Sequence, residues 1–107
     1  MEKLYEAEVT TLAGRNGHAT SADGLLDLDV RFPKEMGGAG GATNPEQLFA
    51  AAWSACFGTS VTIAANAEKV EIGEVSVTAK ISVLHSAGNY DLGANLLIKI
   101  NGVDYDT

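Results

Sequence analysis

The feature that most constrains the fold is a long stretch without charged side chains in the middle of the chain. Between Glu46 and Glu68 the sequence is rich in Ala, Leu, Phe and Trp and contains no Asp, Glu, Lys or Arg. Asn44 is a favourable N-cap and Pro45 suits the first helical position. We therefore predict a helix from Glu46 to about Ala67, roughly 33 Å long at about 1.5 Å per residue.

Such a helix is apolar on nearly all sides, so it must be buried on most of them. The chain has 107 residues, which is the size of one domain, and we interpret residues 1–107 as a single domain. A domain this small has little surface with which to cover the helix. We therefore predict that a second copy of the chain completes the cover, which makes the protein a homodimer.

Alternation of apolar and polar residues predicts an antiparallel meander before the helix. The two-residue period of residues 3–12 and of residues 26–31 is typical of strands with one buried face. A short strand is expected between them, near residues 18–20, with a turn on either side. Residues 33–43 contain a run with four glycines in five positions and are expected to form a loop, without the spacing of a nucleotide-binding motif.

The same alternation predicts a hairpin after the helix. Residues 74–84 and 92–100 have the pattern of strands, and residues 86–91 are expected to form the loop that joins them. Residues 102–107 look like the approach to a further helix. The predicted fold class is accordingly α+β, with a twisted antiparallel sheet packed on one long buried helix.

The charge balance narrows the classes of partner. The formal net charge is −7, from 14 acidic and 7 basic residues, which argues against binding to nucleic acid or to an anionic membrane surface. We find no stretch close to the ~18 consecutive apolar residues of a membrane span. The N-terminus lacks the apolar core of a signal peptide, so we expect a cytoplasmic protein.

A single cysteine, Cys56, limits the covalent and metal chemistry of the chain. It excludes an internal disulfide framework, and with only His18 and His85 as further soft ligands it excludes a thiolate zinc site. We expect no metal and assign neither histidine a role. A free cysteine inside an apolar helix is more commonly a small core residue than a reactive thiol. A reactive Cys56 would need a cation from elsewhere, because it lies about three turns from the helix N-terminus.

Other candidate residues also have structural explanations. Glu46 lies in the first turn of the predicted helix, where the interaction of an acidic side chain with the helix dipole stabilises the helix by about a few tenths of a kcal/mol. Arg15 lies in an expected turn, where an arginine is usually a solvated surface charge. Phe49 and Trp53 are four residues apart and are more commonly core residues than ligand contacts.

Beyond these single residues, the segment from Ala42 to Ala51, continued by residues 54–57, closely resembles the organic hydroperoxide resistance (Ohr) proteins of the Ohr/OsmC superfamily. The resemblance rests on an Asn-Pro-Glu opening with a cysteine at the same offset. It is strong from residue 3 to about residue 70 and looser in the later strands. The glutamine after Glu46 and the early Arg15 favour the Ohr branch over the OsmC branch. Three further segments resemble the N-terminal half of that family: residues 14–18, 23–28 and 33–38.

The resemblance implies an OsmC-like fold, an intertwined homodimer with two active sites at its interface, and a thiol-dependent peroxidase. In such an enzyme Cys56 would be the reactive cysteine, which reduces an organic hydroperoxide to an alcohol and becomes a sulfenic acid. Arg15 would activate the thiol and Glu46 would orient Arg15. The implied substrates are organic hydroperoxides, including lipid-derived ones, in oxidative stress defence. No cofactor is implied, and the reductant would be an external dithiol of the lipoyl type, such as a lipoylated protein.

Helix geometry adds a constraint to this scheme. Ten residues separate Glu46 from Cys56, which is about 15 Å of axial rise and more than a glutamate side chain spans. An Arg15–Glu46 pair that serves Cys56 must then come from the other subunit. Apolar neighbours of the cysteine would favour substrates with an alkyl tail, and the expected substrate-binding residues are Phe49, Trp53 and Phe57.

The sequence departs from the Ohr pattern after the last strand. Family members continue with another helix and a final strand, and that helix carries a second, resolving cysteine, whereas this sequence has no second cysteine. We consider a truncated chain, an enzyme with one cysteine that an outside thiol rescues, and a family member without peroxidase turnover.

The residues are also compatible with two other function classes. In a non-catalytic OsmC-like dimer with a binding or structural role, Cys56 would be only a core residue. A hydrolase or acyl-transferase that uses Cys56 is a weaker alternative, because neither histidine lies in a recognisable pairing motif.

Overall fold

The structure is a computed structural model and describes residues 1–102. These residues form two compact units that meet in the sequence at Pro45 and Glu46, and each unit is described by itself. The single domain expected over residues 1–107 stays a prediction. The expected approach to a further helix at residues 102–107 lies almost entirely outside the described residues.

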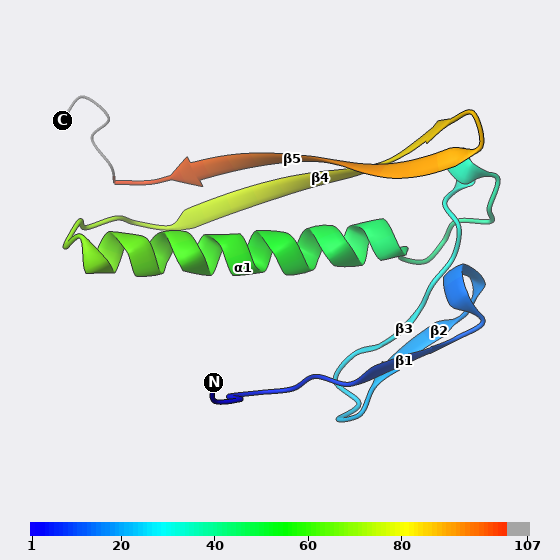
Figure 1. The fold of residues 1–107 in the computed structure, drawn as a ribbon, viewed down its shortest axis with the longest axis horizontal. Coiled ribbons are helices and arrows are strands. Elements are labelled where there is room, and N and C mark those ends of the chain that lie inside the picture. Colours follow the sequence, from blue (N-terminus) through cyan, green and yellow to red (C-terminus); the bar gives the residue numbers. More distant parts are fainter. Residues whose placement is uncertain (103–107) are drawn as a thin grey trace. The chain divides into compact units, whose positions relative to one another are not determined.

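The first unit is the predicted antiparallel meander. Its strands β1 (Val9–Leu12), β2 (His18–Ser21) and β3 (Asp27–Asp29) lie in the order β1-β2-β3 (Figure 1). A short 3-10 turn over Gly14–Asn16 joins β1 to β2. Ala19 and Val30, each 3% exposed, form the small apolar centre of the unit. The short strands 18–20 and 26–31 are thus confirmed to within a residue or two.

The N-terminal strand is shorter than predicted, which corrects the expectation of a strand over residues 3–12. Only Val9–Leu12 pair with β2, and the last bond joins Ala22 N to Glu8 O at 2.9 Å. Beyond that point β2 has ended in a turn. Residues 3–7 therefore have no neighbouring strand, within the described part of the chain, to which their backbone could hydrogen-bond. Alternation favours a strand, but the backbone also needs a partner to bond with.

The glycine-rich segment is a loop, as predicted, with one 3-10 turn at Lys34–Met36. It folds tightly over Phe32: the amide of Gly40 donates to the carbonyl of Phe32 at 3.1 Å. A Cβ at Gly38 would lie 2.2 Å from that same carbonyl oxygen, so only glycine fits there. The loop returns to the meander where Val30 forms a parallel bridge with Thr43.

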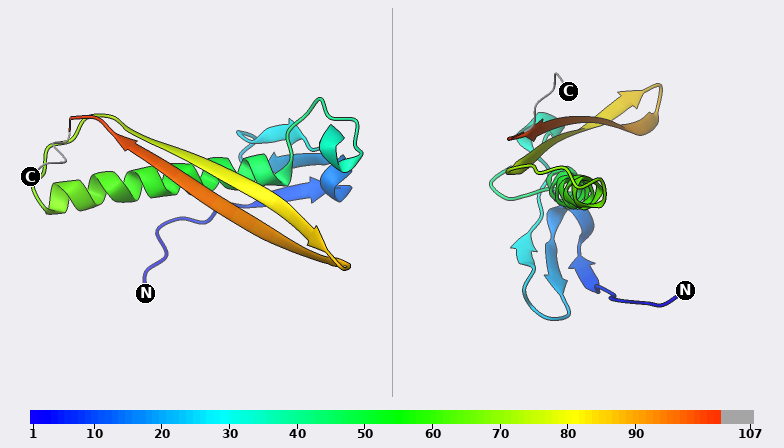
Figure 2. Two further views of the ribbon diagram at one scale, coloured as in Figure 1. Left: turned by 90° about the horizontal axis from the view of Figure 1, so that it is seen from above. Right: turned by 90° about the vertical axis from the view of Figure 1, so that its left-hand side faces the viewer.

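The second unit combines one long helix with one long hairpin (Figures 1 and 2). Helix α1 spans Pro45–Ala67, which confirms the predicted helix and its start at the proline. Strands β4 (Val75–Ser86) and β5 (Asn89–Ile100) pair antiparallel along their full length and lie along one side of the helix. The α+β class with antiparallel sheets and one helix is therefore confirmed, with two separate sheets among residues 1–102.

The hairpin turn is tighter than expected. The prediction of a loop over residues 86–91 is wrong, because Ser86 still pairs with Asn89 and only Ala87 and Gly88 connect the two strands. Both have positive φ, 50° and 83°, which is the signature of a type I′ turn. That turn has the right-handed twist of the flanking strands, so pairing extends to the last residue before it.

Helix α1 is not buried within the single chain, and the expectation that a second copy of the chain completes its burial stays a prediction. None of its residues is buried, because the hairpin covers only one side of it. By length and composition it is also long and apolar enough to cross a membrane, which corrects the expectation that no stretch comes close. That observation is weak evidence for a membrane, since core helices of soluble proteins meet the same criterion.

Candidate functional site

Helix α1 has two different long faces. At about 100° per residue, Phe49, Trp53 and Cys56 fall within about 60° of one another. The rings of Phe49 and Trp53 meet edge to face, with centroids 5.6 Å apart, a favourable aromatic geometry. Phe49 is 49% exposed and Trp53 36%, and Cys56 is a free, exposed cysteine. We call this side, together with the half-buried Phe57, the aromatic face.

The opposite face of α1 consists of small residues and lies against strand β4. A Cβ at Gly58 would lie 3.7 Å from a methyl carbon of Val77, which is ordinary contact distance. A shallow groove runs along this side, and its lining residues are Ser54, Ala55, Gly58, Thr59, Thr62, Val75 and Val77. The hairpin therefore uses the face away from Cys56 and leaves the aromatic face exposed in the single chain.

Cys56 is consequently not a core residue of the single chain. For the cysteine to act only as packing, a partner surface would have to cover the aromatic face. The backbone carbonyl of Cys56 accepts a hydrogen bond from Ser60 Oγ at 3.1 Å, one turn further along the helix. The thiol itself projects from an apolar, uncharged stretch of helix, so a cation that activates it must come from another part of the protein.

Glu46 lies in the first turn of α1, as predicted. It is half-buried, and its carboxylate oxygen Oε1 is shielded from solvent. Shielding a charged oxygen is costly unless donors or cations compensate it. Glu46 is therefore more than a fully solvated surface acid that stabilises the end of the helix.

Arg15 lies in the 3-10 turn between β1 and β2 and is half-buried. The turn begins at Ala13, whose φ of 61° is left-handed, and the amide of Asn16 donates to the Ala13 carbonyl at 3.2 Å. The guanidinium carbon of Arg15 lies 5.8 Å from the centre of the Phe32 ring, a cation–π contact. Arg15 is thus held by its surroundings and is not a freely solvated charge.

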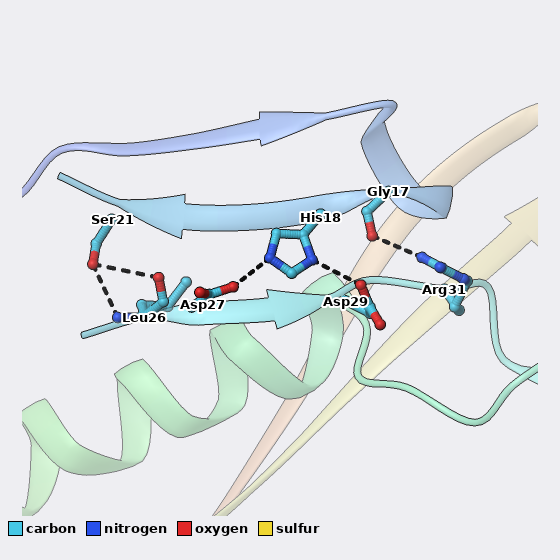
Figure 3. Close-up of polar contacts among 7 residues, drawn as sticks. All are labelled: Gly17, His18, Ser21, Leu26, Asp27, Asp29 and Arg31. Carbon is cyan, nitrogen blue, oxygen red and sulfur yellow. Dashed lines mark hydrogen bonds and ion pairs between the residues drawn. The ribbon is translucent and has the colours of Figure 1, made fainter. Parts of the chain in front are cut away.

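Sequence reasoning assigned no role to His18, but the structure places it between two carboxylates of β3 (Figure 3). Nδ1 lies 2.7 Å from Asp29 Oδ1, and Nε2 bonds to Asp27 Oδ1. The hydrogen bonds to Asp29 and Asp27 raise the pKa of His18, and the bond from His18 lowers the pKa of Asp29. The register of β2 against β3, in which His18 lies opposite Asp29, brings these residues together, and the alternation of the predicted strands did not specify that register.

Arg31 is the second residue that sequence reasoning missed. Its Nη1 donates to the carbonyl of Gly17 at 2.7 Å (Figure 3). The same nitrogen donates to the carbonyl of Val30 at 2.7 Å. The alternation of residues 26–31 put Arg31 on the polar face of its strand, but nothing in the sequence indicated that it reaches back to the turn that carries Arg15.

The predicted site residues divide between the two units. Arg15 belongs to the first, and Glu46, Cys56 and the aromatic residues belong to the second. The structure brings Phe49, Trp53 and Cys56 onto one face, whereas the pairing of Arg15 with Glu46 and Cys56 stays a prediction. Within residues 1–102 no group of three or more His, Cys, Asp or Glu side chains could hold a metal ion.

Comparison with known sequences identifies the family to which the chain belongs. A family model described as OsmC-like protein matches residues 37–104. The organic hydroperoxide resistance protein of Xanthomonas axonopodis pv. citri is 41% identical over 94% of this chain and 72% of its own length. The organic hydroperoxide resistance protein OhrB of Bacillus subtilis is 37% identical over 94% of this chain and 75% of its own length.

Solved structures agree with the sequences. A crystal structure of an organic hydroperoxide resistance protein from Legionella pneumophila superposes with a TM-score of 0.90 at 42% identity, over 98% of this chain and 77% of that one. The crystal structure of Bacillus subtilis OhrB gives a TM-score of 0.84 at 35% identity, over 97% and 78% of the two chains. The resemblance of the segment from Ala42 onward is thereby confirmed over nearly the whole chain, and the chain belongs to the OsmC-like family, among the organic hydroperoxide resistance proteins.

Proposed function

We propose that this protein protects cells against organic hydroperoxides as a thiol-dependent peroxidase. The observation that carries the proposal is the position of Cys56, a free and exposed cysteine on the aromatic face of α1. It occurs in a chain that is 41% identical to a protein named for organic hydroperoxide resistance. A packed structural cysteine would have been expected on the face that contacts the hairpin.

The proposed reaction is an attack of the Cys56 thiolate on the distal oxygen of the hydroperoxide. The S–O bond forms as the O–O bond breaks, the leaving alkoxide takes up a proton to become an alcohol, and Cys56 is oxidised to a sulfenic acid. The Arg15 guanidinium would favour the thiolate and stabilise the negative charge that develops on the leaving oxygen. Glu46 would hold that guanidinium by a charge-assisted pair and so fix its direction.

The assembly we propose is a homodimer in the cytoplasm. Glu46 and Cys56 are about 15 Å apart along one helix, so Glu46 and the Arg15 it orients would serve the cysteine of the other subunit. Exposure of the aromatic face in the single chain supports this arrangement, since large exposed apolar surface is typical of an interface. We also propose that residues 1–107 form a single domain, whose apolar helix a second copy of the chain would cover.

Substrate and reductant follow from the same face. Phe49, Trp53 and Phe57 lie on the same aromatic face as Cys56, and apolar surface there would hold an alkyl tail and favour organic hydroperoxides over hydrogen peroxide. An external dithiol would reduce the Cys56 sulfenic acid back to the thiol and release water, as the resemblance to the Ohr proteins implies. We propose a lipoyl-type dithiol, such as a lipoylated protein, and no metal or other cofactor.

The test is the intact mass of the protein after one equivalent of cumene hydroperoxide, with hydrogen peroxide in a parallel sample. We expect a rapid gain of one oxygen at Cys56, faster with the organic peroxide. Cys56→Ser should gain no oxygen and remain folded, which makes it the matched control. Failure of Cys56 to oxidise within seconds would contradict the proposal and favour a non-catalytic dimer.

A further inference from the structure

The segment Val30–Arg31–Phe32 contacts the turn that carries Arg15 at three points. The amide of Val30 donates to the carbonyl of Gly17 at 2.9 Å, and Arg31 Nη1 donates to the same carbonyl at 2.7 Å. The ring of Phe32 lies 5.8 Å from the Arg15 guanidinium carbon. Three successive residues thus hold both the end of the turn and the side chain that the turn presents.

Arg31 makes the strongest of these contacts. It is half-buried, and the same Nη1 also donates to the Val30 carbonyl at 2.7 Å. Charge-assisted hydrogen bonds of this length are about twice as strong as neutral ones. The backbone amide of Arg31 donates to the carbonyl of Thr43 at 2.9 Å, so this residue also ties the turn to the end of the glycine-rich loop.

The turn needs such an anchor because its own bonds are few. It is a three-residue 3-10 turn without a side-chain cap, and both Ala13 and Gly14 have positive φ, at 61° and 55°. Short 3-10 turns have poorer hydrogen-bond geometry than an α-helix. Gly17 closes the turn so tightly that a Cβ there would lie 1.6 Å from the Leu12 carbonyl oxygen. Its carbonyl, held by Val30 and Arg31, is the fixed point of the turn.

We propose that Arg31 is a positioning residue for hydroperoxide reduction: by holding the Gly17 carbonyl it fixes the turn in which Arg15 is presented. The inference rests on the proposed function, in which the Arg15 guanidinium stabilises charge on the reacting oxygens. A stabilising group must be aimed before the reaction, because a displacement of about 1 Å can cost about a hundredfold in rate. Arg31 acts through Arg15 and does not contact the substrate.

A double-mutant cycle on the rate of Cys56 oxidation separates this role from general stabilisation. We would measure single-turnover oxidation by cumene hydroperoxide for the unmodified protein and for Arg31→Met, Arg15→Met and the double variant. Methionine keeps the unbranched stem of arginine and removes the donors. We expect Arg31→Met to slow oxidation about tenfold, which is part of the loss expected from misalignment. In the Arg15→Met background the same change should have no further effect.

Ser21 offers a matched structural control at the other end of the β2–β3 pair (Figure 3). Its Oγ accepts from the amide of Leu26 at 2.9 Å and donates to Asp23 Oδ1 at 2.6 Å. Ser21→Ala should lower the Tm without slowing the oxidation of Cys56. Arg31→Lys keeps the charge but loses the planar fork, so it should recover part of the rate that Arg31→Met loses.

The outcomes separate the inference from the proposed function. If the unmodified protein does not oxidise at Cys56, the proposed function fails and the inference fails with it. If it oxidises and Arg31→Met is equally fast, or slows oxidation equally with and without Arg15, only the inference is overturned. If Arg31→Met does not fold, the cycle is run with Arg31→Lys. The inference would then be overturned if Arg31→Lys showed faster amide exchange in the turn but oxidised Cys56 at the rate of the unmodified protein.

Discussion

The two units of this chain hold themselves together by different means. In the first, the meander has only Ala19 and Val30 as buried apolar residues, and polar contacts of His18 and Arg31 tie its short strands and turn together. In the second, a helix with no buried residue lies beside a hairpin of two long strands. Hydrogen bonds of a few polar side chains can therefore stabilise a small unit that has little apolar core. An apolar helix needs more apolar surface to bury it than one hairpin provides.

The largest expected effect is on assembly through α1. Ile63 is 63% exposed and lies on the same side of the helix as Cys56, about 20° away. Ile63→Glu would place a charge in the proposed dimer interface, and we expect the dimer dissociation constant to rise by about a hundredfold or more. Sedimentation velocity measures the change.

Ser86→Glu is the control for that experiment, because it adds the same charge at the exposed end of β4. It should leave the oligomeric state unchanged. If the unmodified protein is monomeric at micromolar concentration, or if Ile63→Glu remains as dimeric as the control, a second copy does not cover this face of α1. The contrast drawn between the two units would then be wrong.

The next effect is on the stability of the meander. Gly17→Ala would place a methyl group 1.6 Å from the backbone oxygen of Leu12, so the chain itself must move. We expect a loss of about 3 kcal/mol in the free energy of unfolding, measured by urea denaturation. Gly24→Ala is the matched comparison: its φ is 77° with no atom within 4 Å, and left-handed strain alone should cost about 1 kcal/mol. Equal losses would show that the Gly17 turn is not tightly closed.

The smallest effect is the pH dependence that His18 confers. Its folded pKa is raised above the ordinary 6.5, so its contribution is complete below that value and is lost as the pH rises through the raised pKa. The pKa of Asp29 is lowered from the ordinary 3.8, so its contribution is present above that value and is lost as the pH falls through the lowered pKa. The pair stabilises most fully between about pH 4 and 6.5.

His18→Gln should remove the decline in stability that the histidine causes above pH 6.5. We would compare urea midpoints at pH 5.5 and 8.5 for both proteins, and the difference between the two pH values should be smaller in the variant. The effect is small because all three side chains are solvent-exposed. An unchanged difference would mean that the contacts of His18 with Asp27 and Asp29 do not contribute to folding in solution.

Much of the local structure could be predicted from the sequence. The proline after Asn44 and the uncharged stretch behind it placed helix α1, and the alternation after residue 74 placed both strands of the hairpin. The expected apolar face is half-buried along most of β4, whereas in β5 Leu92 and Ile98 of that face are exposed. The predictions that were wrong concern partners. Residues 3–7 alternate like a strand but have no ladder to join, and Ala87–Gly88 closes the hairpin more tightly than its composition suggested.

The candidate site shows the same division. Residue patterns indicated the family and the helix that carries Cys56. They also placed Glu46 a long way from the cysteine, because helical rise and period follow from the backbone alone. Only the tertiary structure showed which face of α1 the hairpin uses, that His18 lies between two carboxylates, and that Arg31 reaches the turn of Arg15. These depend on register between strands and on the path of the loop, which long-range contacts decide and local patterns do not encode.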